Sequence, residues 1–339
     1  MAGFVAALRE AGLLAEVIPT YRRPGLMDKW LPALRALRSV PRAVRRLRAE
    51  GKVPIVYAHA GAAVSLARES VVLAAARRAG AVTVLQLHAV SVDRYLAHPI
   101  MRRLLAVAVA PAHALAVLTP YWRDGLIRHG FRQPIFVVPD PLPPDFESVA
   151  RAASPRRAPE DVVRVCIITH LRAGKGVDLL VRAAQHLPPK FSVVVAGDGP
   201  ERAAYERLAK DLALSNLRFV GWVEGQAKHR LLADSDVFCL PTRYDSFGMG
   251  FIEAMCYALP VVALRWGPVP SVVADGESAV LVDQAEPEPI ALALQSLQDP
   301  VRRAAMGAAG RRVALERYGL AAVARCLSDA LRQLAQECP

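Results

Sequence analysis

The chain has 339 residues, of which 53% are apolar and 22% charged, and it carries a formal net charge of +12. This length predicts two domains at roughly 150 residues each, and the composition excludes a disordered chain. All of the excess positive charge falls in residues 1–160, which hold 23 Lys or Arg against 11 Asp or Glu. Such a basic half suits nucleic acid, an anionic membrane or an anionic acceptor.

Targeting signals and cysteines point to the compartment. No apolar run reaches the ~20 residues of a membrane helix, and the first residues lack the pattern of a secretory signal. The five cysteines are scattered and show no metal-ligand spacing. We therefore expect reduced thiols in a cytoplasmic protein, which can work at the inner face of the membrane.

The N-terminal half opens with a helical pattern around Phe4 and Leu8. Strand-length apolar runs follow at 15–19, 54–60, 81–89, 114–119 and 134–140. A Rossmann-like domain normally opens with a strand and a glycine-containing turn, so the first strand is apparently missing. We expect that the polypeptide begins about twenty residues upstream, with Met1 internal. A genuinely short, inactive protein is the alternative.

A basic amphipathic segment runs from Trp30 to Gly51, with its arginines near one face and its aliphatic residues near another. It is typical either of a helix on an anionic membrane or of a surface helix with a solvated face. We expect Pro41 to break it.

The C-terminal half alternates more clearly between strands and helices, which predicts a parallel sheet covered on both faces. The expected strands are 163–169, 191–197, 217–223, 236–242 and 260–265, and the expected helices are 176–187, 201–213, 224–234, 250–258 and 268–274. A Pro- and Arg-rich linker is expected at 141–160, and a last helix with undetermined docking at 320–336. We predict an α/β protein with Rossmann-like domains at 1–155 and 156–318, which face a ligand-binding cleft, and a C-terminal helix at 319–339.

The segment from Asp245 to Glu253 carries the strongest functional signal. It links an expected strand to an expected helix, with two carboxylates eight residues apart around Gly248. A helix N-terminus suits a phosphate, and the carboxylates can accept hydrogen bonds from sugar and ribose hydroxyls. A plain loop in which Asp245 caps the next helix is the competing interpretation.

A second candidate is the loop around Arg172, Gly174 and Lys175, which follows the strand at 163–169. Two cations in a glycine-containing loop suit a diphosphate, although no Walker motif is present. Solvated loop charges are the alternative.

The order of these segments resembles the retaining glycosyltransferases of family 4, which have the GT-B fold. The resemblance covers about residues 162–285 and rests on the segments LRAGKGVDLLVRAA, VVVAGDGPERAAYERLA, LRFVGWV, ADSDVFCLPTRYDSFGMGFIEAMCYALPVVAL and DGESAVLV. It implies transfer of a sugar from a nucleoside diphosphate sugar to a hydroxyl acceptor, lipid-linked or a polysaccharide, with retention at the anomeric carbon.

The resemblance implies roles for residues of the Asp245–Glu253 segment. Glu253 matches the acid that accepts hydrogen bonds from the ribose hydroxyls, and Asp245 matches the acid that contacts the donor sugar. Phe247, Gly248 and Met249 match the turn and helix start whose backbone N–H groups meet the sugar and phosphate.

Outside that segment, Lys175 and the neighbouring Gly174 match the loop that binds the diphosphate. His88 lies near the place of a histidine that approaches the donor sugar, although a histidine at a strand end is as often structural.

This sequence departs from the family pattern at two positions. Asp245 stands where a Glu is usual, roughly 1.5 Å shorter in reach. His170 stands where the family has a diphosphate-binding Arg, and Arg172 can substitute for it.

A metal-binding DxD motif is imitated by Asp234 and Asp236, which we interpret as structural. We expect no metal, no cofactor and no nucleic-acid partner, and peripheral membrane contact through the basic half. A non-catalytic protein that binds a nucleotide sugar remains an alternative. A nucleotide-sugar epimerase is another, but it would require an acid–base pair that the sequence does not offer.

Overall fold

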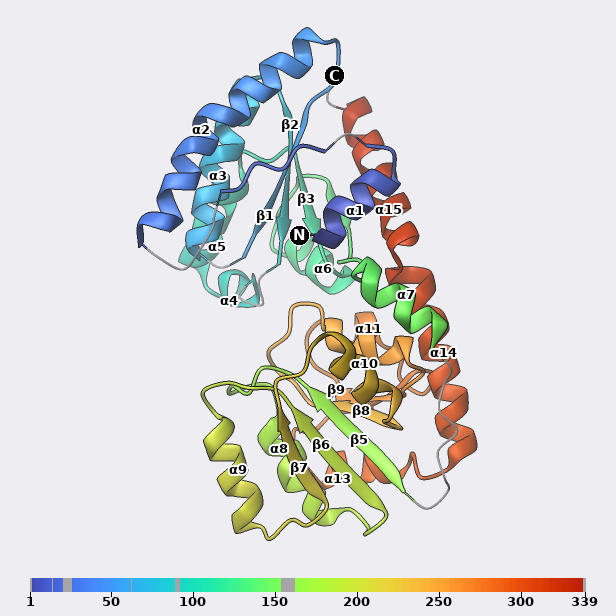
Figure 1. Ribbon diagram of the computed structural model, residues 1–339. Coiled ribbons are helices and arrows are strands. Elements are labelled where there is room, and N and C mark those ends of the chain that lie inside the picture. The colour runs from blue at the N-terminus through green and yellow to red at the C-terminus, as the bar shows by residue number, and fades with distance from the viewer. Residues whose placement is uncertain are drawn as a thin grey trace. The chain divides into compact units, whose positions relative to one another are not determined.

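The computed structural model describes residues 2–13, 15–20, 26–61, 63–88, 92–153 and 162–337. The chain forms two compact units, Met1–Pro139 with Val323–Pro339, and Asp140–Ala322 (Figure 1). Each unit contains one parallel sheet with helices packed on it. None of the described helices is both long and apolar enough to cross a membrane.

The first unit has a sheet of four parallel strands in the order β1-β2-β3-β4. Its strands are β1 (Ile55–Ala60), β2 (Val82–Leu87), β3 (Ala114–Val117) and β4 (Ile135–Val137). Its helices are α1 (Ala2–Glu10), α2 (Leu26–Ala49), α3 (Ala63–Arg78), α4 (Val92–Ala97), α5 (Pro99–Val109) and α6 (Pro120–Arg128). Every residue of β2 and β3 is buried, as expected for parallel strands covered on both faces.

The C-terminal helix docks onto this first sheet. Helix α15 (Leu320–Glu337) buries Leu327, Leu331 and Leu334, whose spacing places them on one face, against Val84 and Ala116. Helix α1 contributes to the same cluster, while α3, α5 and α6 contribute to a second cluster with β2 and β3. Packing with strands far away in the sequence decided where α15 docks.

The strand expected at 15–19 is wrong, because residues 15–20 form no regular structure. Ile18 packs into the cluster between α2 and α3, and Thr20 Oγ1 donates a hydrogen bond to Glu69 Oε1 at 2.7 Å. Val17 is more than half exposed, and Pro19 has no N–H to donate to a ladder. One partly buried aliphatic side chain and one hydrogen bond therefore attach this segment to the helices.

The expected break at Pro41 is also wrong, since α2 runs through Pro32 and Pro41 to Ala49. An internal proline costs a helix ~3 kcal/mol. Val40 and Val44, however, are buried against Val72 of α3. Each fully buried valine contributes ~1.5–3 kcal/mol, so the two together offset the cost of Pro41.

The second unit has a sheet of six parallel strands in the order β10-β9-β8-β5-β6-β7. The strands are β5 (Val163–Ile168), β6 (Phe191–Ala196), β7 (Leu217–Gly221), β8 (Val237–Leu240), β9 (Val261–Leu264) and β10 (Ala279–Val282). The helices are α7 (Pro144–Ala152), α8 (Val177–Ala183), α9 (Arg202–Asp211), α10 (Gly225–Ala233), α11 (Met249–Cys256), α12 (Val269–Val272), α13 (Pro287–Gln295) and α14 (Pro300–Tyr318), with a 3-10 turn η1 (Ala184–His186).

The segment expected as a linker contains helix α7, so that expectation is wrong for residues 144–152, while residues 154–161 lie outside the described residues. Phe146 is buried and stacks on His229 of α10, with ring centroids 4.7 Å apart. Glu147 accepts a hydrogen bond from Leu320 N at 2.7 Å. These contacts place α7 in the second unit, whereas the expected boundary at 155 would assign it to the first.

Candidate functional site

The strand order of the second unit reverses between β5 and β8. From β5 the chain adds β6 and β7 on one side, and then returns to place β8, β9 and β10 on the other side. The carboxyl ends of neighbouring parallel strands meet at such a switch point, which is where open α/β sheets bind ligands. Both segments singled out in the sequence follow these two strands, at 169–176 and 241–248.

Backbone contacts hold these two loops together. Arg243 N donates to Gly174 O at 2.8 Å, and Thr242 Oγ1 donates to the same oxygen at 3.3 Å. Gly176 has a φ of +75°, and a Cβ there would lie 2.1 Å from Pro241 O. Only glycine permits this close approach of the two chains, so the loop pair is built as one unit.

Lys175 and Asp245 come together across this loop pair. Their Nζ and Oδ2 atoms lie 2.7 Å apart, and both side chains are largely buried. The shorter reach of Asp245 is therefore sufficient to contact Lys175. The carboxylate holds the ammonium group in place at the switch point, where it can meet a phosphate.

Glu253 lies in α11 and pairs with a residue that the sequence reasoning missed, Lys228 of α10, with Nζ and Oε1 2.5 Å apart. Burial raises the pKa of Glu253, and Lys228 opposes this shift. Lys228 is 25 residues from Glu253, so no local pattern could have predicted the pair. Glu253 thus offers a partly buried carboxylate close to the switch point.

The N-terminus of α11 is formed by a left-handed glycine. Gly248 is the residue that precedes the helix, with φ +86° and with a Cβ position only 2.4 Å from Phe251 Cδ2. Met249 and Gly250 follow half-buried, and the first N–H groups of a helix lack intrahelical acceptors. The side chain of Phe247 is 3% exposed and packs edge-on against Tyr318, so only its backbone remains for a ligand.

Arg172 and His170, in the loop that follows β5, each contact an aromatic side chain. Neither aromatic residue was predicted from the sequence. The guanidinium carbon of Arg172 lies 4.0 Å from the ring centroid of Tyr244. The ring of His170 stacks on Trp222, with centroids 4.8 Å apart. Arg172 thus lies over the loop that follows β8, next to Asp245, whereas His170 turns to the residue that follows β7.

The remaining predicted residues lie elsewhere. His88, at the end of β2 in the first unit, forms a hydrogen bond with His59 of β1, with Nε2 and Nδ1 2.8 Å apart. Asp236 accepts from Arg164 N and donates its own N–H to Arg164 O, both at 2.8 Å, and thus joins the starts of β8 and β5. Within the described part of the chain, no three His, Cys, Asp or Glu residues are grouped to hold a metal ion.

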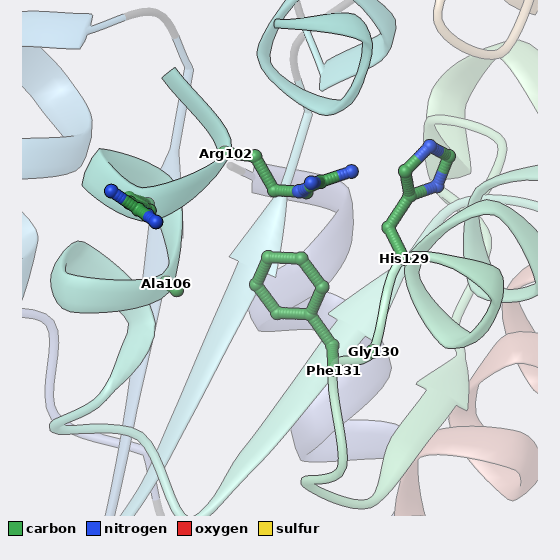
Figure 2. A pocket seen from close by; sticks show the side chains of 6 residues that line it. Arg102, Ala106, His129, Gly130 and Phe131 are labelled. Atoms are coloured by element: carbon green, nitrogen blue, oxygen red, sulfur yellow. The ribbon is translucent and has the colours of Figure 1, made fainter. Parts of the chain in front are cut away.

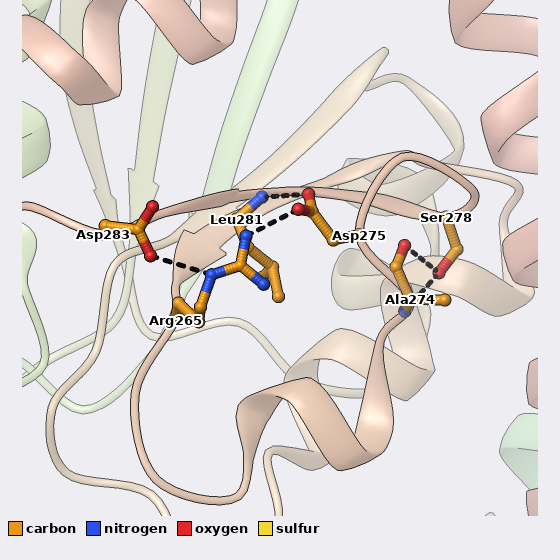
Figure 3. A network of polar contacts seen from close by, with 6 residues as sticks. All are labelled: Arg265, Ala274, Asp275, Ser278, Leu281 and Asp283. Atoms are coloured by element: carbon orange, nitrogen blue, oxygen red, sulfur yellow. Dashed lines mark hydrogen bonds and ion pairs between the residues drawn. The ribbon is translucent and has the colours of Figure 1, made fainter.

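A polar network ties down the loops around β9 and β10 (Figure 3). Arg265 bridges Asp275, at 2.6 Å, and Asp283, at 2.8 Å. Burial opposes the ionisation of Asp275, but the hydrogen bond from Leu281 N and the bond to Arg265 together lower the pKa of this carboxyl. The network fixes the turn that precedes β10 (Ala279–Val282) to the loop that follows β9.

Two units, each with a parallel α/β sheet, are the architecture of the GT-B class of proteins. Solved structures agree: HepE of Anabaena in complex with UDP and glucose has a TM-score of 0.70 at 18% identity, over 97% of this chain and 89% of that one. Sucrose-phosphate synthase of Thermosynechococcus elongatus has a TM-score of 0.69 at 21% identity, over 93% and 82%. At these identities the likeness concerns the fold.

A match to a known family covers much of the second unit. The model of glycosyl transferases group 1 matches residues 151–313, and this part of the chain is similar to that family, which confirms the resemblance to family 4. A GDP-mannose-dependent phosphatidylinositol monomannoside mannosyltransferase of Mycolicibacterium smegmatis is 32% identical over 53% of this chain and 50% of its own length. A D-inositol 3-phosphate glycosyltransferase of Xylanimonas cellulosilytica is 33% identical over 59% and 49%. The chain thus spans about half the length of these relatives.

Proposed function

We propose that the protein transfers a hexose from a nucleoside diphosphate sugar to a hydroxyl acceptor, with retention. The observation that carries this proposal is the joined loop pair at the switch point, where Asp245 holds Lys175 just before the N-terminus of α11. A cation and free N–H groups placed together suit the diphosphate of such a donor. Glu253 would accept hydrogen bonds from the ribose hydroxyls.

The proposed chemistry asks little of side chains beyond placement and charge. Negative charge develops on the diphosphate as the glycosidic bond breaks, and Lys175, Arg172 and the α11 N-terminus would stabilise it. The departing phosphate can take the proton of the acceptor hydroxyl, so no protein base is required. We therefore propose a reaction that is independent of metal ions.

The acceptor is proposed to be lipid-linked. The mannosyltransferase of Mycolicibacterium smegmatis is named for a phosphatidylinositol mannoside, and the basic half of this chain suits an anionic membrane surface. We include peripheral membrane contact of the first unit, at the cytoplasmic face, in the proposal. A non-catalytic nucleotide-sugar binder is the second candidate, favoured by His170 in place of the expected diphosphate Arg.

A donor panel tests this proposal. The protein is incubated with UDP-, GDP- and ADP-sugars, with and without EDTA, and release of the nucleoside diphosphate is measured. We expect release from one donor class and the same rate in EDTA. Binding without release would favour the non-catalytic candidate, and activity that disappears in EDTA and returns with a divalent ion would contradict metal independence.

The pH dependence of nucleotide binding is expected to follow Glu253. A carboxylate accepts two ribose hydrogen bonds only when ionised, and burial raises the pKa of Glu253, so affinity should fall on acidification at a higher pH than for an ordinary glutamate. Lys228 opposes this shift, so Lys228→Ala should move the loss of affinity to still higher pH. Calorimetric titration with the nucleoside diphosphate measures both midpoints. Glu253→Gln, which does not titrate, should remove the dependence, and an unchanged profile in that variant would exclude Glu253 as its origin.

A further inference from the structure

Helix α5 of the first unit presents apolar side chains to solvent. Ile100, Leu104 and Val107 are 63%, 56% and 72% exposed, and their spacing of four and three residues places them on one face. The neighbouring helix α3 adds Val64 and Val71, which are also more than half exposed. A surface helix normally turns polar residues outward, so an apolar stripe of this kind marks an interaction surface.

A basic pocket of about 180 Å³ is formed in part by the same helix (Figure 2). Arg102, Arg103 and Ala106 of α5 line it together with His129, Gly130 and Phe131. The guanidinium of Arg102 extends toward the imidazole of His129, near the ring of Phe131. The ring of His129 is fixed by a 2.8 Å hydrogen bond from Nδ1 to Gly125 O.

Neither arginine of this pocket, Arg102 or Arg103, forms an ion pair with a carboxylate among the described residues. Guanidinium groups bind phosphate oxygens in a planar, bidentate manner, so a phosphate group matches this pocket in charge and hydrogen bonding. Helix α5 therefore carries both an apolar stripe and two pocket arginines, of which Arg103 lies nearer to the stripe.

We propose that this α5 surface binds an anionic phospholipid bilayer. Ile100, Leu104 and Val107 would enter the boundary between headgroups and acyl chains, while Arg102 and Arg103 hold lipid phosphates. The positive excess of residues 1–160 adds long-range attraction to such a surface. A second copy of the chain fits less well, because two α5 surfaces would bring together four arginines that form no ion pair with the described residues. The inference rests on the membrane contact proposed above and assigns it to α5, not to the basic helix α2.

Vesicle flotation tests the inference. The full chain is mixed with vesicles of phosphatidylcholine alone or with phosphatidylglycerol, and the partition coefficient is measured. We expect binding to the anionic vesicles only. Arg102→Gln with Arg103→Gln should weaken it by about 25-fold, at about fivefold for each cation near the surface. Ile100→Ser with Leu104→Ser and Val107→Ser should weaken it by at least about tenfold.

Matched variants in the second unit control for charge and apolar content. Arg207→Gln with Arg218→Gln removes the same charge from exposed positions, and Leu292→Ser with Val301→Ser removes exposed aliphatic side chains. Both control variants should bind vesicles like the unchanged protein.

Equal binding by the α5 and control variants, or no binding to anionic vesicles, would overturn the inference. Light scattering distinguishes a second copy as the partner. If the chain is dimeric, becomes monomeric in the stripe variant and does not bind vesicles, the α5 surface is a dimer interface. Nucleotide binding, measured in parallel, tests the proposed donor site. Loss of nucleotide binding and loss of vesicle binding can therefore be told apart.

Discussion

Replacing Lys175 by Ala is expected to lower the rate of sugar transfer by ~10²–10³, the usual effect of losing one group that stabilises developing negative charge. The physical reason is the position of the ammonium group, held 2.7 Å from Asp245 at the switch point of the second sheet. Glu253→Ala is expected to act mainly on nucleotide affinity, because it removes the proposed ribose acceptor. Steady-state kinetics with the preferred donor separates kcat from KM for each variant.

The partner of Lys175 requires its own control, since Lys175→Ala leaves Asp245 partly buried without a counter-ion. The double variant Lys175→Ala with Asp245→Ala removes both charges and should recover thermal stability without recovering turnover. Lys210→Ala, on the exposed side of α9, should leave the kinetics unchanged. Wild-type transfer rates in both Lys175→Ala and Glu253→Ala would show that the donor binds elsewhere.

Gly176→Ala should have the largest structural effect at the site. The added Cβ would lie 2.1 Å from Pro241 O, which is backbone and cannot rotate away, so the loop pair must separate. Since Lys175 is the preceding residue, we expect the variant to lose nucleotide binding below detection and to lower the melting temperature. Calorimetric titration and thermal unfolding measure the two effects.

Gly276→Ala is the matched control for this substitution. Gly276 has φ +76°, almost the same as the +75° of Gly176, and nothing lies within 4 Å of its Cβ position. Both variants incur the left-handed strain of about 1–2 kcal/mol, and only Gly176→Ala adds the clash. A similar loss of stability in both variants, with nucleotide binding intact in Gly176→Ala, would contradict the importance of the close approach.

The sequence by itself determined most strands of the second sheet and the position of the segment from Asp245 to Glu253. Strands β5, β6, β8 and β9 begin and end within two residues of the predicted runs, because a buried parallel strand is apolar throughout and is read locally. The segment from Asp245 to Glu253 was located for the same reason, since a strand, a glycine turn and a helix start leave local signals.

Only the tertiary structure decided which distant groups meet. Lys175 and Asp245 are 70 residues apart, and their pairing requires β5 and β8 to be neighbours in the sheet. Local patterns failed at residues 15–19 and at Pro41. Packing of the partly buried Ile18 against α2 and α3 outweighed strand propensity, and burial of Val44 outweighed the cost of a proline. The sequence likewise did not determine where α15 docks. In the structure Leu327, Leu331 and Leu334 pack against Val84 and Ala116 of the first sheet. The free energy of burial comes from the apolar surfaces that the fold brings into contact. A local sequence pattern shows that a surface is apolar, but not which distant surface it packs against.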